Sequence, residues 1–160
     1  MACENGHKEV VSLLLADPRI DPNKPNNDGV TPFFKACRKG HKVVVSLLLA
    51  DPRIDPNKPD DQNGATPFVI ACENGHKEVV SLLLACPRID PNKPKNDGAT
   101  PFLIACGKGH KEVVSLLLAD PRIDPNKPND KKFTPYVRMA ARSWFSCYWQ
   151  IRESTQQAKE

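Results

Sequence analysis

The chain has 160 residues, enough for one domain of ordinary size, and its composition is 39% hydrophobic and 26% charged. This balance excludes a disordered tail. The sequence contains no run of about 18 apolar residues, so we expect no membrane-spanning helix. The formal net charge of +4 comes from interleaved basic and acidic residues, which does not favour a nucleic-acid-binding protein.

The first residues and the cysteines indicate a reducing compartment. The N-terminal MACENGHKEVV lacks the basic segment and apolar core of a signal peptide, so we expect a cytoplasmic protein. Four of the six cysteines recur in one sequence context, at Cys3, Cys37, Cys72 and Cys106. They therefore occupy one repeated position, and we expect all six to be free thiols.

A nearly literal internal repeat runs through most of the chain. A Gly-His pair recurs every 34 or 35 residues, and its histidines are His7, His41, His76 and His110. Thr-Pro pairs recur with the same spacing, and they begin at Thr31, Thr66, Thr100 and Thr134. A segment close to VVSLLLA follows each Gly-His pair.

Each unit predicts two short helices in chain order. Thr31 is a suitable N-cap, and Pro32 suits the first helical position because no N–H is needed there. The first helix is expected over FFKACRK, with Gly40 ending it in a left-handed conformation. The second helix is expected over KVVVSLLLA and should stop at Asp51-Pro52, because the residue before a proline avoids the helical region.

The second helix is apolar over much of its surface. The residues concerned are Val44, Val45, Leu47, Leu48 and Leu49. So wide an apolar face must pack against neighbours on more than one side, and stacked copies of the unit provide such neighbours. The next segment, RIDPNKPDDQNG, is rich in proline and turn residues and predicts a protruding finger with a positive φ at Gly64.

The segment from Gly64 to Leu84, GATPFVIACENGHKEVVSLLL, resembles the ankyrin repeat, whose pattern is G-x-T-P-L-H-x-A-A-x-x-G-H-x-x-V-V-x-L-L-L. The resemblance implies an all-α ankyrin-repeat solenoid of helix-turn-helix units with β-turn-like fingers. It covers roughly residues 2 to 135, so we expect a domain over residues 1–135 with one partial repeat, three full repeats and the start of another.

Three features depart from the family pattern. Phe34, Val69 and Leu103 replace the histidine of T-P-L-H, which in the family ties adjacent repeats by hydrogen bonding, so packing must take its place. Pro-Arg-Ile-Asp follows the second helix where the family has Gly-Ala-Asp. The period is also longer than in the family, and the extra length lies in the finger.

Both ends of the sequence are unusual for such a domain. The chain starts at Ala2-Cys3, in the middle of the first helix of a unit, and this first unit looks like an interior one. Solenoids normally end in repeats with a polar outer face. We therefore expect exposed apolar ends that promote self-association.

After Pro135 the repeat disappears, and residues 136–160 read as a repeat translated out of frame. We back-translated this tail and took codons from the third base of one codon to the second base of the next. The genetic code then forces Gly from Met139-Ala140, Val from Trp144-Phe145, Leu from Cys147-Tyr148 and Tyr148-Trp149, and Ala from Trp149-Gln150. In order and spacing these residues match NGHKEVVSLLLA, so we interpret the tail as degenerate and either helical or disordered.

The recurring Cys-x-x-Gly-His pairs resemble metal ligands. Zinc needs four convergent ligands, and pairs displaced along a solenoid do not converge, so we expect no metal and no other cofactor. The cysteine is expected to replace a core alanine, and the histidine to form hydrogen bonds within its own loop. A Cys-His nucleophile would need an orienting acid, so we expect no enzyme. A pocket that holds titratable groups from different repeats would instead indicate an enzyme.

The residues expected to bind a partner are those that vary among the otherwise copied repeats. In the family, the fingers and first helices line a concave binding surface, so the resemblance implies contacts there, whereas Phe33, Phe68 and Phe102 are expected in the core. In the fingers the candidates are Asn27, Asp28, Asp61, Gln62, Asn96 and Asp97. In the first helices they are Lys35, Arg38, Ile70, Glu73, Ile104 and Lys108.

The resemblance implies a scaffold for protein–protein interaction that binds an unidentified protein, and the charge and hydropathy pattern leads us to expect no nucleic acid and no membrane. The alternative is a non-functional fragment of a larger, decayed ankyrin-repeat protein, which the truncated start and the out-of-frame tail favour. Intact in-frame repeats on both flanks in the genome would support this alternative.

Overall fold

A computed structural model describes residues 1–131 of the chain. This part contains eight α-helices and no strand, as the all-α prediction required. The helices are α1 (Ala2–Asn5), α2 (Lys8–Ala16), α3 (Pro32–Lys39), α4 (Lys42–Ala50), α5 (Pro67–Glu73), α6 (Lys77–Leu84), α7 (Pro101–Lys108) and α8 (Lys111–Ala119). The predictions for the tail fall outside the described residues.

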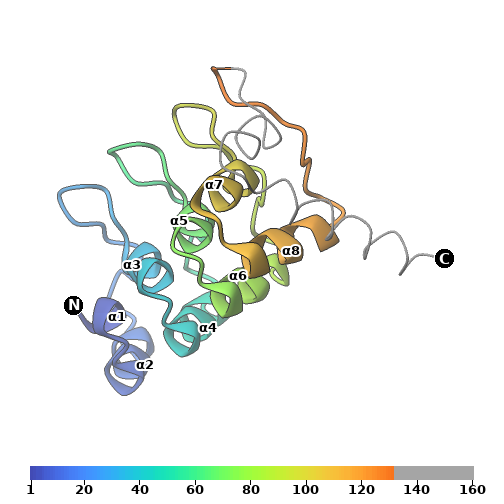
Figure 1. The fold of residues 1–160 in the computed structure, drawn as a ribbon. Helices are drawn as coiled ribbons and strands as arrows, with labels where there is room; N and C mark the ends of the chain where they lie inside the picture. Colours follow the sequence, from blue (N-terminus) through green and yellow to red (C-terminus); the bar gives the residue numbers. More distant parts are fainter. Residues whose placement is uncertain (132–160) are drawn as a thin grey trace.

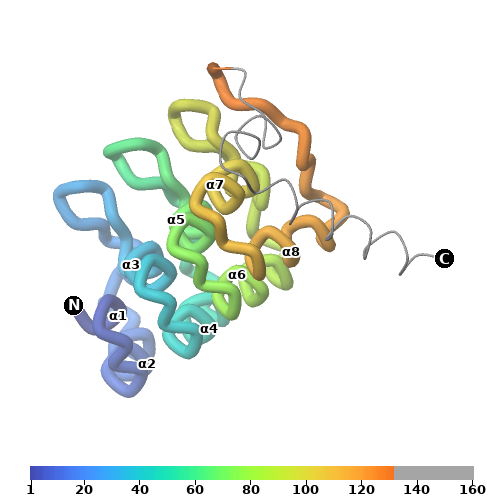
Figure 2. The backbone as a smooth tube through the Cα atoms, in the orientation of Figure 1, coloured from blue at the N-terminus to red at the C-terminus, as the bar shows by residue number. Residues whose placement is uncertain are grey.

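The helices stack in two parallel rows, which confirms the predicted solenoid. The first helices of the units, α1, α3, α5 and α7, contact one another in sequence, and so do the second helices, α2, α4, α6 and α8. Each first helix also packs on the second helix of its own unit. The loops between units project from the stack as fingers that lie side by side (Figures 1 and 2).

The ends of the first helices follow local sequence signals, as predicted. The hydroxyl of Thr31 accepts a hydrogen bond from the backbone N–H of Phe34 at 3.1 Å, and Thr66 and Thr100 cap α5 and α7 in the same way. A proline opens each of these helices. Gly40 ends α3 with φ 76°, the left-handed conformation that glycine adopts at little cost.

The core lies between the two rows of helices. Phe33, Phe68 and Phe102 are buried there together with Cys37, Cys72 and Cys106, which confirms the core assignment of these residues, whereas Cys3 in the first unit is only half-buried. In the second helix, Val44, Val45 and Leu48 are at most 1% exposed. Leu47 and Leu49 are only half-buried, so the predicted apolar face is in part accessible.

A second apolar cluster joins the first helices to the bases of the fingers. It contains Val30, Phe34, Ala65, Val69, Ala99, Leu103 and Ile104. The three residues that replace the family histidine belong to it and are at most 2% exposed. Packing therefore takes the place of the missing histidine contact, as the sequence predicted.

The histidines of the Gly-His pairs connect neighbouring repeats, and the prediction of hydrogen bonds within their own loop is wrong. Nε2 of His76 lies 2.9 Å from the carbonyl oxygen of Arg38, in the preceding unit. His41 and His110 make the same contact with the carbonyls of Glu4 and Glu73. A carbonyl only accepts, so Nε2 carries the proton. Stacking places the imidazole on the open carbonyl end of the preceding first helix.

The arginine after each second helix also connects neighbouring repeats. Nη2 of Arg53 donates to the carbonyl of Leu15 at 2.8 Å, and Nη2 of Arg122 donates to the carbonyl of Leu84 at 2.7 Å. These carbonyls lie at the end of the preceding second helix, where no intrahelical partner exists. The motif Pro-Arg-Ile-Asp thus connects neighbouring repeats. The sequence pattern had predicted only that this segment belongs to a protruding finger.

The asparagine of each Asp-Pro-Asn segment continues this connection. The side-chain amide of Asn57 donates to the carbonyl of Arg88 at 2.6 Å, and its oxygen accepts from the backbone N–H of Asp90 at 3.0 Å. Asn23 makes the same pair of bonds to the next unit. The side chain therefore pairs with the extended backbone of the next repeat as a neighbouring strand would.

Candidate functional site

The finger tips, residues 26–29, 60–64 and 95–98, together with the outward side chains of α3, α5 and α7, form one surface, which we term the finger face. Successive tips are joined by backbone hydrogen bonds. The N–H of Asp61 donates to the carbonyl of Asp28 at 3.2 Å, and the N–H of Asn96 donates to the carbonyl of Asn63 at 2.9 Å. The tips are therefore held in a row, as the parallel loops in Figure 2 show.

Each tip is also closed internally, as the second one shows. Asp60 is 9% exposed, and its Oδ1 accepts from the N–H groups of Asn63 and Ala65 at 3.2 and 2.9 Å. Gly64 has φ 69°, as predicted, and a Cβ at this position would collide with the side chain of Asn96. Glycine is thus required both by the backbone conformation and by the approach of the next tip.

All six finger candidates are exposed at the tips. They are Asn27, Asp28, Asp61, Gln62, Asn96 and Asp97. Two of these side chains also help to shape the tips, because Asp97 accepts from the backbone N–H of Ala99 at 3.1 Å and Asp28 accepts from the side-chain amide of Asn26 at 3.2 Å. All six side chains are exposed, so they can meet a partner.

The helix candidates occupy more varied environments. Lys35, Arg38, Ile70 and Glu73 are half-buried, and Lys108 is exposed. Ile104 is 8% exposed and packs in the second apolar cluster, so the finger face does not include it.

Four of the helix candidates form ion pairs across neighbouring units. Glu4 lies 3.1 Å from Nζ of Lys35 and 3.4 Å from Nη2 of Arg38, and Glu73 lies 3.3 Å from Nζ of Lys108. The hydrogen bond from Lys35, and then its charge, lowers the pKa of the Glu4 carboxyl. Sequence reasoning missed Glu4 because only the stacking offset between units brings it beside the two cations.

The charges of the finger face are therefore divided by location. Along the helices, acidic and basic groups alternate from unit to unit, and Glu4 pairs with two cations while Glu73 pairs with one. At the tips, Asp28, Asp61 and Asp97 are exposed carboxylates, and none of the three forms an ion pair within residues 1–131. Lys95 is the one basic residue of the three tips, so the tips present a net negative charge to an approaching molecule.

The thiols and imidazoles of the repeat do not form a reactive group in the described part. Burial raises the pKa of the Cys37 and Cys72 thiols, so they stay protonated at neutral pH. Cys3, Cys37, Cys72 and Cys86 are free thiols, in agreement with the prediction for these four. Over residues 1–131, no cluster of three or more His, Cys, Asp or Glu side chains has a geometry suited to a metal ion.

The described helices are also short. Within residues 1–131, none has the length and apolar character needed to cross a membrane.

Comparison with known proteins agrees with this architecture. No curated protein matches the chain. The sequence model of a family described as ankyrin repeats (3 copies) matches residues 1–60 and 53–129. These matches cover most of the chain and the same helix pairs and fingers that the structure shows, so the protein belongs to the ankyrin-repeat family.

Proposed function

We propose that the protein is a non-enzymatic scaffold that binds a partner protein against its finger face. The observation that carries this proposal is the row of exposed polar tip residues on a backbone that is hydrogen-bonded from tip to tip. A surface held in this way loses little conformational freedom on binding. Ankyrin repeats generally serve in protein–protein interaction, and we place this protein in the cytoplasm.

The charge of the tips suggests the chemistry of the partner. Asp28, Asp61 and Asp97 favour a segment with basic side chains, whereas the half-buried Ile70 offers an apolar contact between the fingers and the helices. We therefore propose a partner segment that combines lysine or arginine with an apolar anchor.

Selection of peptides from a random display library against the immobilised chain tests this proposal. We expect basic peptides, and we expect about a tenfold or greater loss of their affinity in the triple variant Asp28→Lys, Asp61→Lys, Asp97→Lys. A matched control carries the same charge change on the second helices, Glu9→Lys, Glu78→Lys, Glu112→Lys. The proposal fails if the control weakens binding and the finger variant does not.

Self-association through the first unit is a further part of this proposal. Val10 and Leu14 of α2 are 46% and 42% exposed, whereas Val44 and Leu48, at the same positions of the next unit, are 1% exposed. A face that is apolar by sequence and accessible in the structure supports association through this end of the stack.

The alternative, a non-functional fragment of a larger, decayed ankyrin-repeat protein, stays a prediction. The residues that the genetic code forces out of frame in positions 136–160 favour it, and these positions lie outside the described residues. The gene sequence tests it directly, because the shifted frame either encodes a repeat or does not.

A further inference from the structure

A row of leucines crosses the surface formed by the outward side chains of α2, α4, α6 and α8, which we term the helix-two face. Each helix contributes one leucine at the same repeat position. These are Leu13, Leu47, Leu82 and Leu116. Leu13 is 74% exposed and the other three are half-buried, so the row is accessible along its length.

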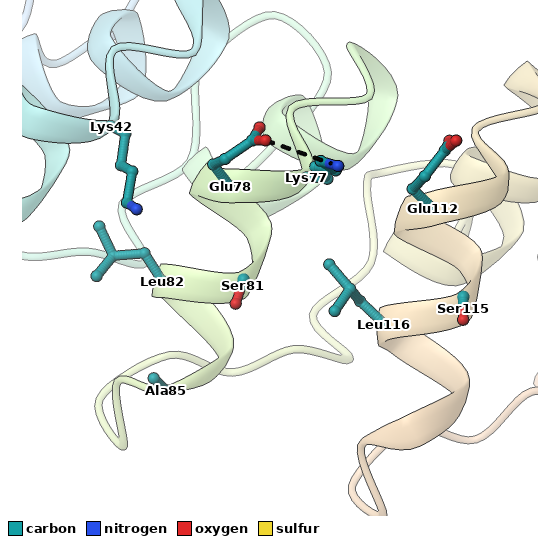
Figure 3. A pocket seen from close by; sticks show the side chains of 9 residues that line it. All are labelled: Lys42, Lys77, Glu78, Ser81, Leu82, Ala85, Glu112, Ser115 and Leu116. Carbon is teal, nitrogen blue, oxygen red and sulfur yellow. Dashed lines mark ion pairs between the residues drawn. The ribbon is translucent and has the colours of Figure 1, made fainter.

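The leucines lie in grooves between neighbouring second helices. Leu13 and Leu47 line a groove of about 500 Å³ between α2 and α4. Leu82 and Leu116 line a groove of about 720 Å³ at α6 and α8. Figure 3 shows both of these side chains projecting in the same direction, each toward the preceding unit. The helix-two face therefore offers grooves with apolar lining at the spacing of the repeat.

One position makes the groove between α2 and α4 more apolar than its counterparts. The helices α2, α6 and α8 begin with Lys-Glu, whereas α4 begins with Lys42-Val43. Val43 is 55% exposed and lines the groove with Leu13 and Leu47. The valine removes a carboxylate and adds an exposed apolar side chain, a change that contributes nothing to the core of its own unit.

The edge of the helix-two face carries both signs of charge. Lys8 lies 3.6 Å from Glu9, and Lys77 lies 3.9 Å from Glu78, and all four side chains are more than half exposed. Lys42 has no adjacent carboxylate because Val43 takes its place. Mixed charges of this kind disfavour an anionic membrane surface, which would require an excess of basic residues.

We propose that the helix-two face is a contact surface for a second copy of this chain. The groove between α2 and α4 accepts apolar side chains from a facing pair of helices, and a second copy carries Leu13, Val43 and Leu47 at the matching spacing. A two-fold contact sets the leucine rows against each other. It also allows the lysines of one copy to face the glutamates of the other, and it leaves the finger face free for its partner.

The position of Val43 identifies where this contact is centred. On the helix-two face, the exposed large apolar residues within residues 1–131 are Leu13 and Val43, and both line the groove between α2 and α4. The contact has few exposed apolar side chains at its centre, so the dimer should be reversible and dependent on concentration.

Sedimentation equilibrium of the full chain tests the proposal. We expect a monomer–dimer equilibrium for the wild type and about a tenfold or larger increase in the dimer dissociation constant for Val43→Glu. This substitution restores the Lys-Glu start of the other repeats at an exposed position, so the fold should be kept, and circular dichroism checks this. The matched control Glu78→Val places a second valine on the row and should leave the dimer as stable or make it tighter.

A further variant separates this contact from stacking through the end of the solenoid. Val10→Asp charges the exposed end of the first unit, where a stacked repeat would lie, and should change the dissociation constant less than Val43→Glu. The proposal is overturned if the wild type is monomeric at all concentrations. It is equally overturned if Val10→Asp abolishes association while Val43→Glu leaves it unchanged, because the ends then make the contact.

Discussion

At the scale of single residues, small differences between copied repeats show what each position does. In the second and fourth units, Arg53 and Arg122 hold the carboxylates of Asp51 and Asp120 as well as a carbonyl of the preceding unit. The hydrogen bonds from these arginines lower the pKa of both carboxyls. The third unit has Cys86 where the others have aspartate, so its arginine lacks the carboxylate of its own turn.

Cys86→Asp should therefore stabilise the protein. We expect the free energy of unfolding in urea to rise by about 0.5–1 kcal/mol at neutral pH, the usual contribution of a partly exposed ion pair with good geometry. Arg88 already donates to the carbonyl of Ile54 at 3.0 Å, so formation of the new ion pair should cost little further side-chain entropy. Cys86→Ser is the control, because it changes the thiol without adding charge.

The gain should depend on pH in a defined direction. The new carboxyl is expected to have a folded pKa below the ordinary aspartate value of 3.8, as Asp51 does. A lowered pKa contributes stability above the unfolded pKa and loses it as the pH falls through the folded pKa. Urea midpoints of the Asp and Ser variants should thus converge in acid. A difference that persists at the acid end would argue against an ion pair.

At the scale of the elements, the helices are too short to be stable alone. The first helices α3, α5 and α7 contain 8, 7 and 8 residues, and isolated helices of that length are marginal in water. Their starts depend on a threonine that is almost fully buried, as at Thr66 with 1% exposed. The second helices end differently where the capping residue changes: α6 ends at Leu84 beside Cys86, whereas α4 and α8 extend to the alanine before aspartate.

Thr66→Ala should lower the free energy of unfolding by about 1–2 kcal/mol, since the N–H of Val69 then loses its acceptor in a buried place. Thr66→Ser keeps the hydroxyl and should retain most of the stability. Urea denaturation followed by circular dichroism measures both. Equal losses in the two variants would show that the methyl group, and not the cap, is what matters.

At the scale of the whole molecule, position in the stack decides what an apolar residue contributes. The helix contacts connect each unit mainly with its neighbours, which is the pattern of a linear solenoid. Leu14 and Leu83 hold the same position in copied helices, yet they are 42% and 0% exposed. The difference comes from the unit that covers Leu83 and is absent beside Leu14 within the described structure.

Leu83→Ala should therefore destabilise the protein by about 2–5 kcal/mol, because it leaves a cavity between two units. Leu14→Ala removes the same atoms from a partly exposed site and should cost less than half as much. Guanidinium unfolding of the two variants measures the contrast. Similar losses would mean that another part of the protein covers Leu14 in solution.

Features that depend on adjacent residues could be predicted from the sequence. The Thr-Pro starts, Gly40, the positive φ of Gly64 and the buried position of Phe68 follow from local conformational preference and from periodicity. The repeat itself implied stacking, since such apolar helices cannot be stable alone. The finger tips of the candidate site were also predictable, because residues that vary within copied turns are visible in the sequence.

Contacts between repeats could not be predicted in the same way. The bond from His76 to the preceding unit, the pairing of Glu4 with Lys35 and the burial of Ile104 depend on the offset between neighbouring units. By itself, the sequence determined which segments form helices and that the helix pairs stack on one another. Only the tertiary structure decided which side chains of one unit meet those of the next, because an identical residue is buried or exposed according to what lies beside it.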